Sequence, residues 1–323
     1  MPLRMGLSKL KEFFMAIKIG TGPDSWGISS PKSPSQINWK QCINEISQAG
    51  YEYTELGPLG YFSTDPIILK KELEKSNLKL SAVTVMAGHL EIQTDWSDIH
   101  TKLIETGKLG AELEALHIVL IDDFYRDIHT GVKKTEKILN EDQWKIFIEN
   151  THKFSQLAKE YYNLQTVFHP HAETHIETEQ QIEKFLEWSD PSLISLLLDT
   201  GHHAYGGGDA ISFFEKHHER IPYIHLKNVN PKILTEIKNE NSSMVEAVSK
   251  GVFCEPNKGI IDIKAFAKTV IKNNYDGLIT VEQDMYKPNH DIPLKVAIKT
   301  RNYLNNIGSV SYTHLTLPTI YSV

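Results

Sequence analysis

The chain has 323 residues, of which 40% are hydrophobic and 23% charged, with a net charge of −7 when histidine is neutral. This length suits one large α/β barrel or two modest domains, and the acidic balance argues against nucleic acid, which requires a basic surface. No apolar run approaches the roughly 20 residues that cross a bilayer, so we expect no membrane partner.

Two cysteines, Cys42 and Cys254, are too few for a disulfide framework or a cysteine metal cluster, and they favour a reducing, cytoplasmic location. Residues 1–14 precede Met15 and lack the long apolar segment of a signal peptide, so we interpret them as an N-terminal extension. Residues 308–323 lose the preceding helical pattern and are interpreted as a non-native or disordered tail. One domain is therefore expected over 15–307.

Strand patterns and helix patterns alternate along this domain. Strands are expected at 15–22, 51–56, 78–85, 115–121, 164–168, 193–198, 221–226 and 276–281. Helices are expected at 39–49, 65–76, 95–109, 140–161, 178–188, 210–218, 262–273 and 291–305. Such alternation predicts a parallel sheet, and eight units predict a single-domain (β/α)8 TIM barrel with eight parallel strands.

An open, doubly wound sheet is the competing α/β fold. It is disfavoured because the first strand is followed by a proline-containing loop at 22–27, not by a glycine-rich phosphate loop that opens a helix. Residues 229–257 form a long polar insertion with a short helix expected near 242–248. This insertion is interpreted either as a cover over the site or as a subunit contact, so a homo-oligomer stays open.

Ionisable residues stand at the ends of three apolar strands. Asp199 ends the sixth strand, His225 lies near the end of the seventh, and Glu282 follows the eighth. In a barrel the loops after the strands form the active face. Carboxylates and imidazoles without thiolates suit a hard or borderline divalent cation such as Mn²⁺, Co²⁺, Mg²⁺ or Zn²⁺. The pattern predicts these three residues as metal ligands, with a fourth from the fifth strand.

Each ligand also has a structural alternative. His225 can be a hydrogen-bonded core histidine, Asp199 can cap the following turn, and Glu282 can be a surface acid. His117 lies inside the fourth strand and is expected to pack in the interior. Further polar residues follow the other strands, and barrel closure would bring them to the same rim: Glu55, His89, His169, His171, Glu173, His202 and Lys227.

Three segments resemble the xylose isomerase-like TIM-barrel superfamily of metal-dependent sugar isomerases and epimerases. They are Leu-Asp-Thr-Gly-His at 198–202, Ile-His-Leu-Lys-Asn at 224–228 and Val-Glu-Gln-Asp at 281–284. The segments 22–27, 53–61 and 169–174 further resemble the inosose dehydratases, which dehydrate 2-keto-myo-inositol. The resemblance spans 15–305 and implies Asp199, His225 and Glu282 as metal ligands, with His202 contacting substrate oxygens.

The end of the fifth strand departs from the superfamily pattern. The isomerases and epimerases usually carry a glutamate there, as ligand and acid/base, whereas here His169, His171 and Glu173 follow the strand. We expect His171 or Glu173 to replace the missing ligand, and we assign Glu173 to the metal set. The departure speaks against a two-glutamate epimerase mechanism and favours dehydration.

The resemblance implies a hydro-lyase of inositol catabolism that removes the proton α to a ketone and expels a β-hydroxyl. The expected cation is Mn²⁺ or Co²⁺, with Mg²⁺ or Zn²⁺ as alternatives. His171, His202 or Glu173 would act as the base, and Lys227 would stabilise the enolate or donate a proton. The expected substrate contacts are Trp26, Glu55, His89 and His202.

Three other functions fit parts of the same pattern. A metal-dependent sugar isomerase or ketose 3-epimerase would share the ligands but release no water. An abasic-site endonuclease would need further ligands and a basic groove, which the net charge of −7 disfavours. A sugar-binding barrel without turnover is the alternative that is not an enzyme, and the altered fifth strand keeps it open.

Overall fold

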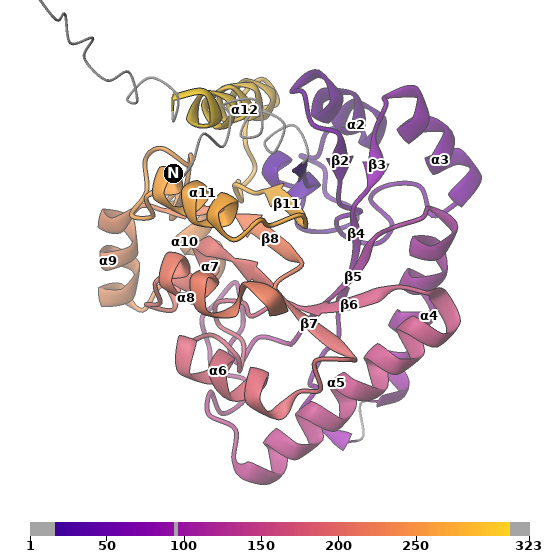
Figure 1. The fold of residues 1–323 in the computed structure, drawn as a ribbon, viewed down its shortest axis with the longest axis vertical. Helices are drawn as coiled ribbons and strands as arrows, with labels where there is room; N and C mark the ends of the chain where they lie inside the picture. Colours follow the sequence, from indigo (N-terminus) through magenta and orange to yellow (C-terminus); the bar gives the residue numbers. More distant parts are fainter. Residues whose placement is uncertain (1–16, 94–95, 311–323) are drawn as a thin grey trace, which may run out of the picture.

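Nine strands of the computed structural model form one parallel sheet around which the helices are arranged (Figure 1). The structure describes residues 17–93 and 96–310, without the side chains of 308–310. The expected extension at 1–14 lies outside the described residues, as does 311–323 of the expected tail at 308–323. Residues 308–310 are helical and so continue the preceding helix. The strands are β1 (Lys18–Thr21), β2 (Tyr53–Thr54), β3 (Lys79–Leu80), β4 (Ala82–Met86), β5 (His117–Ile121), β6 (Gln165–Phe168), β7 (Ile194–Asp199), β8 (Tyr223–Leu226) and β11 (Leu278–Val281).

The sheet order is β3-β2-β1-β11-β8-β7-β6-β5-β4, and its two ends are halves of the same predicted strand, separated by Ser81. The Ser81 amide donates to the Thr54 carbonyl at 2.8 Å, and the Ser81 carbonyl accepts from the Leu116 amide at 3.0 Å. One residue therefore bonds to both neighbouring strands and closes the ring. This closure confirms the predicted parallel (β/α)8 TIM barrel, with β3 and β4 counted as one strand.

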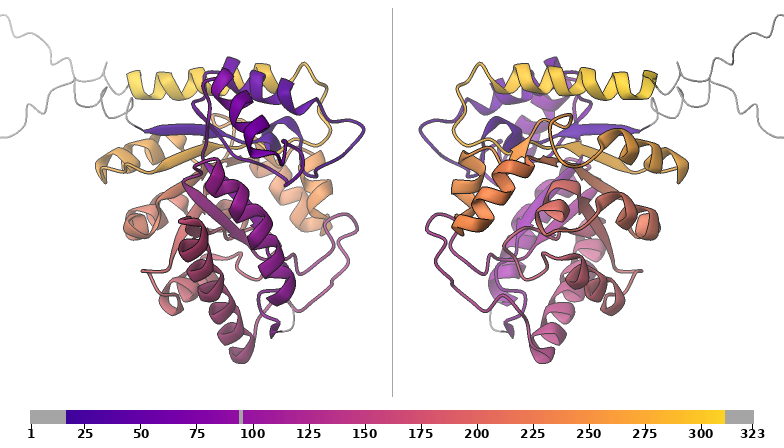
Figure 2. Two further views of the ribbon diagram at one scale, coloured as in Figure 1. Left: turned by 90° about the vertical axis from the view of Figure 1, so that its right-hand side faces the viewer. Right: turned by 90° about the vertical axis from the view of Figure 1, so that its left-hand side faces the viewer.

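Helices cover the outside of the barrel (Figure 2). Side-chain caps at Asn38, Asp65, Asn140 and Thr178 accept from the first free amides of four of them, which explains where these helices begin. All eight predicted helices are present: α2 (Trp39–Gln48), α3 (Pro66–Lys75), α4 (Trp96–Glu112), α5 (Glu141–Tyr162), α6 (Glu179–Trp188), α8 (Ala210–His217), α11 (Ile263–Lys272) and α12 (Pro293–Val310). Within 17–93 and 96–310, no helix is long and apolar enough to cross a membrane.

The barrel interior has its own small core, distinct from the larger layer between sheet and helices. Val119, Val167, Leu197 and Leu278 point inward from four strands and are at most 1% exposed. Burying each such side chain contributes about 1.5–3 kcal/mol. His117 is also buried, and its ring stacks on Tyr223 with centroids 5.2 Å apart, in agreement with the expected interior packing.

The insertion is more regular than the sequence suggested. An antiparallel pair, β9 (Asn228–Val229) and β10 (Phe253–Cys254), frames two helices, α9 (Pro231–Glu240) and α10 (Met244–Ser249). The short helix expected near 242–248 is confirmed as α10, but α9 was missed, although Asn230 caps it and Pro231 occupies its first turn. Apolar side chains of the insertion cluster with α7 (Thr200–Tyr205), directly after β7.

A candidate metal centre at the carboxyl ends of the strands

Four neighbouring strands deliver buried ionisable side chains to one place on the rim. Asp199 is the last residue of β7, His225 lies in β8, and His169 and Glu282 directly follow β6 and β11. The parallel register sets Asp199 opposite His225. All four residues are at most 6% exposed, so their charges and lone pairs interact with one another more than with water.

The atoms of this group are spaced as ligands of one cation would be. His225 Nδ1 is 3.1 Å from Glu282 Oε2 and 3.7 Å from Asp199 Oδ2, and His169 Nε2 is also 3.7 Å from Asp199 Oδ2. Ligand atoms that share a cation at about 2.1 Å lie roughly 3–4 Å apart. Asp199 Oδ2 and His225 Nδ1 are buried without a hydrogen-bond partner among the described residues, which is costly unless something binds them. The donor set therefore fits a divalent cation.

Hydrogen bonds orient each histidine toward this point. His225 Nε2 donates to Glu55 Oε1 at 2.8 Å, which turns Nδ1 toward Asp199 and Glu282. His169 Nδ1 lies 2.8 Å from the Pro170 carbonyl, which only accepts, so Nδ1 carries the proton and the lone pair is on Nε2. A second ring nitrogen held by a carboxylate or carbonyl is typical of metal-binding histidines.

Asp199 is held by the helix that follows it. Its Oδ1 accepts from the His202 amide at 2.8 Å and so caps α7, while Oδ2 stays free for the site. The alternative interpretation of Asp199 as a helix cap is therefore correct for one oxygen, and it does not conflict with a ligand role for the other.

A buried lysine compensates the carboxylates. Lys227 Nζ lies 2.8 Å from Glu282 Oε2, 3.2 Å from Asp199 Oδ2 and 3.1 Å from Asp284 Oδ2. Burial would lower the Lys227 pKa, but the three carboxylates outweigh burial and hold that pKa well above its usual value. Burial would likewise raise the Asp199 pKa, but the ammonium keeps it below its usual range, so the carboxylate stays ionised.

Two further histidines form a wall beside Lys227. The rings of His171 and His202 lie with centroids 3.7 Å apart and planes tilted by 36°, and His202 Nε2 is 3.2 Å from Lys227 Nζ. Burial lowers the pKa of His171 to about 4 and that of His202 well below its usual value, so both rings are neutral at pH 7. The insertion completes this wall, because the Phe253 ring lies 5.0 Å from the His202 ring and 4.8 Å from Lys227 Nζ.

The structure does not bring Glu173 into the metal group. Its carboxylate pairs with Arg126 at 3.4 Å, and its backbone adopts a left-handed conformation with φ of 65°. Burial raises its pKa to about 7. His169 is the residue after β6 whose ligand atom lies with those of Asp199 and His225. The signal for it was available, since His169 is the first ionisable residue after its apolar strand, as Asp199 and Glu282 are after theirs.

The predicted substrate contacts occupy different surroundings. Trp26 is 3% exposed, and its indole nitrogen donates to Glu45 on α2, which directs the ring into the outer core. Glu55 accepts from His225 and therefore positions a ligand. His89 lies elsewhere on the rim, within 3.3 Å of two other carboxylates, and its contact with substrate stays a prediction.

Sequence reasoning missed two carboxylates at the site. Asp24 and Asp284 each offer an oxygen close to one on Glu282, and the three form a further candidate ligand group. Burial, with Glu282 beside it, raises the pKa of Asp24 well above its usual value. Both residues fall in segments, 22–27 and 281–284, that carried the family resemblance, which was the available signal.

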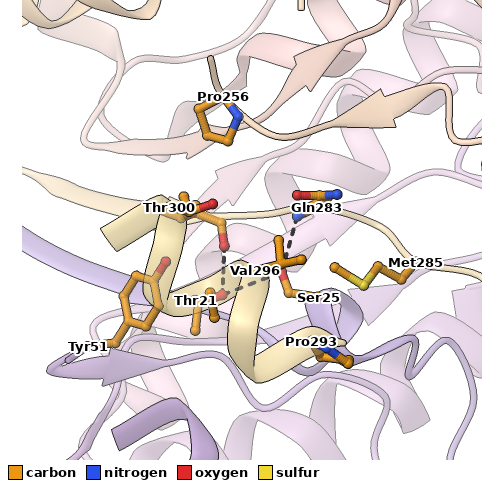
Figure 3. Close-up of a pocket in the computed structure, with 11 residues that line it drawn as sticks. Thr21, Ser25, Tyr51, Pro256, Gln283, Met285, Pro293, Val296 and Thr300 are labelled. Atoms are coloured by element: carbon orange, nitrogen blue, oxygen red, sulfur yellow. Dashed lines mark hydrogen bonds between the residues drawn. The ribbon is translucent and has the colours of Figure 1, made fainter. Parts of the chain in front are cut away.

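A small cavity lies behind the loop that carries Glu282, and residues that line it hold this loop by hydrogen bonds (Figure 3). Ser25 Oγ accepts from the Gln283 amide at 3.1 Å, and Thr21 Oγ1 donates to the Val281 carbonyl at 2.7 Å. The cavity measures about 20 Å³, which is room for one water molecule and far too little for a sugar. It therefore belongs to the structural support of the site.

Comparison with known proteins agrees with this fold and these motifs. A sequence model of the family described as xylose isomerase-like TIM barrel matches residues 43–305. The inosose dehydratase of Clostridium perfringens (strain 13 / Type A) is 30% identical over 292 residues, which are 89% of this chain and 96% of that protein. The inosose dehydratase of Clostridium tetani (strain Massachusetts / E88) is 29% identical over 300 residues, 91% of this chain and 98% of that protein.

Among solved structures, the IolI protein with a bound zinc atom superimposes with a TM-score of 0.68 at 14% identity, covering 92% of this chain and 100% of that one. This likeness concerns the fold. The family match extends over most of the barrel and includes the strands that carry His169, Asp199, His225 and Glu282. The chain therefore belongs to the xylose isomerase-like TIM barrel family, within which it is similar to the inosose dehydratases.

Proposed function

We propose that the protein is a metal-dependent hydro-lyase that dehydrates a cyclic polyol ketone, with 2-keto-myo-inositol as its substrate in inositol catabolism. The observation that supports the metal centre is the close group of buried ligand atoms on His169, Asp199, His225 and Glu282, in which Asp199 Oδ2 and His225 Nδ1 lie 3.7 Å apart and make no hydrogen bond with the described residues. The substrate class is supported by two relatives named inosose dehydratase that align over at least 89% of this chain.

His169, Asp199, His225 and Glu282 would hold the cation. Mn²⁺ or Co²⁺ is the proposed ion, and Zn²⁺ also suits two imidazoles with two carboxylates. When bound, a divalent cation supplies Lewis-acid polarisation of a ketone oxygen, which makes the α-proton more acidic.

His171 is the proposed base. Its Nδ1 lies 2.8 Å from the Ala172 carbonyl and therefore carries the proton, so the Nε2 lone pair is free to accept one. Burial keeps the ring neutral at pH 7, with a pKa of about 4. His202 is the weaker candidate, because Ala172 donates to its Nδ1 and its Nε2 faces the Lys227 ammonium.

The elimination then balances with one histidine. His171 Nε2 takes the α-proton, the C–H electrons form the new double bond, and the β C–O bond breaks. The departing oxygen takes the proton from His171, so one water leaves and the ring returns to its starting state. Lys227, whose pKa is held well above its usual value, keeps its proton and stabilises developing negative charge.

The test uses the full chain stripped of metal with a chelator and incubated with 2-keto-myo-inositol, with and without Mn²⁺, Co²⁺ or Zn²⁺. We expect loss of water and a dione product only when a cation is added. Asp199→Asn should abolish turnover, whereas Asp209→Asn, which makes the same change at the exposed cap of α8 and keeps an oxygen that can cap, should retain it.

Each other outcome identifies a different function. An isomeric ketose without loss of water would replace dehydration by isomerase or 3-epimerase activity. Substrate binding without any product, under all three metals, would show a sugar-binding barrel without turnover.

A further inference from the structure

A second group of buried ligand atoms lies on the same rim, outside the site described above. Glu91 follows β4, Asp122 directly follows β5, and His175 lies in the loop after β6. Each offers one potential ligand atom, and these atoms all lie within 4.8 Å of one another. The three residues are 3%, 0% and 1% exposed, and the proposed dehydration uses none of them.

The two carboxylates of this group lack a compensating lysine or arginine. Among the described residues, Glu91 pairs only with His89 Nδ1 at 3.2 Å and His175 Nε2 at 3.9 Å, and Asp122 pairs only with His175 Nδ1 at 2.6 Å. Glu91 Oε2 is buried without a hydrogen-bond partner in the described chain. Buried carboxylates are normally paired with a cation or bound to a metal, so this oxygen indicates a missing positive partner.

The two ring nitrogens of His175 have different surroundings. Nε2 lies 3.4 Å from the Thr135 hydroxyl and 3.9 Å from Glu91 Oε1, and Nδ1 lies 2.6 Å from Asp122 Oδ2. A cation would therefore take the place of the proton between His175 Nδ1 and Asp122. His89 Nδ1 is also buried without a hydrogen-bond partner in the part of the chain described.

We propose that Glu91, Asp122 and His175 form a second divalent-cation site, and that zinc fits its mixed imidazole and carboxylate ligands. The site joins the loops after β4, β5 and β6, which are separated in sequence by helices α4 and α5. Because the proposed dehydration uses none of these three side chains, the ion would be structural: it would fix this half of the rim, apart from the cation proposed for the catalytic half.

The test counts zinc ions bound to the full chain after equilibrium dialysis and desalting, by inductively coupled plasma mass spectrometry. We expect wild type to bind two ions. The double variant Asp199→Asn/His225→Gln removes the first centre and should bind one, and its melting temperature should still rise with zinc. Adding Glu91→Gln and His175→Gln to that variant should abolish both the ion and the rise.

A matched control separates this site from adventitious binding by the chain's fifteen histidines. Glu183→Gln/His217→Gln removes another Glu–His pair, 2.8 Å apart on α6 and α8, and should leave the count unchanged. A zinc-free Asp199→Asn/His225→Gln variant would overturn the proposal even if Glu91 variants failed to fold. The count does not depend on turnover, so loss of the proposed dehydratase activity would be seen separately.

Discussion

Gly201 lies directly against the side chain of Lys227: a Cβ built at position 201 would stand 2.6 Å from Lys227 Cγ. The close approach of α7 to Lys227, which lies between β8 and β9, thus sets where the ammonium can lie. A methyl group at 201 must push the lysine stem away from Glu282 and Asp199, although alanine suits a helical backbone well.

Gly201→Ala is therefore expected to reduce kcat by about tenfold or more, because the displaced ammonium no longer stabilises developing charge. The protein should stay folded, since overpacking of this size costs only about 1–3 kcal/mol of stability. The coupling between positions 201 and 227 is measured by comparing the effect of Gly201→Ala on kcat in the wild-type protein and in the Lys227→Met variant. In the Lys227→Met background the glycine substitution should have little further effect on kcat. Equal losses in both backgrounds would show that Gly201 acts independently of the lysine.

His169 and Glu173 make opposite predictions for metal content. His169→Gln should weaken Mn²⁺ binding by more than the roughly 10–100-fold typical of a residue that only supports a ligand. Glu173→Gln should leave metal binding unchanged, because that carboxylate pairs with Arg126. Equilibrium dialysis of both variants decides between them, and a larger loss in Glu173→Gln would restore the original ligand assignment.

Glu55 is expected to act on the metal through His225. Glu55→Gln removes the carboxylate that accepts from His225 Nε2, so affinity for Mn²⁺ should fall by about 10–100-fold without loss of the site. The exposed Glu52, on the same segment, provides the matched control Glu52→Gln. Unchanged affinity in Glu55→Gln would mean that packing alone holds the His225 ring.

His117 should make stability depend on pH. Burial, with Lys18 nearby, lowers its pKa in the folded chain to about 4, while the unfolded value is about 6.5. Between these values the unfolded state binds the proton and the folded state does not, so the free energy of unfolding decreases as pH falls below about 6.5.

Replacing this ring isolates its share of the effect. Between pH 7 and pH 5, His117→Phe should lose about 2 kcal/mol less stability than wild type. Urea unfolding at both pH values measures the difference. His129→Gln, which alters an exposed ring, should follow wild type, and identical pH dependence in all three proteins would refute a neutral buried His117.

Periodicity predicted the barrel because each element depends on local pattern: alternating apolar residues, caps such as Asn140, and eight repeats of strand and helix. The break of the third strand at Ser81 was not predictable, since its cause is the geometry of ring closure and not the local sequence. Helix α9 was missed because the polar composition of the insertion hid the start signal at Asn230 and Pro231.

The ligand set was predictable wherever a strand ended directly in an ionisable residue, as at Asp199. It was not predictable after β6, where three candidates follow within five residues. Which of them turns inward depends on the loop, including the left-handed backbone of Glu173 and the bond from the Tyr125 amide to the Glu173 carbonyl. Likewise, the nearness of Glu91 to His175 depends on three loops folding together.

The contact of Phe253 with His202 and Lys227 brings together two separate parts of the protein, the insertion and the barrel rim. The groups that hold charge and move protons lie at the ends of barrel strands or in the segments directly after them, while the ring that covers them belongs to an insertion with its own small core. A change of insertion can therefore reshape the chamber and leave the chemistry intact. In this architecture, substitutions in the insertion are expected to change which substrates bind, and substitutions at the ends of the barrel strands to change the reaction.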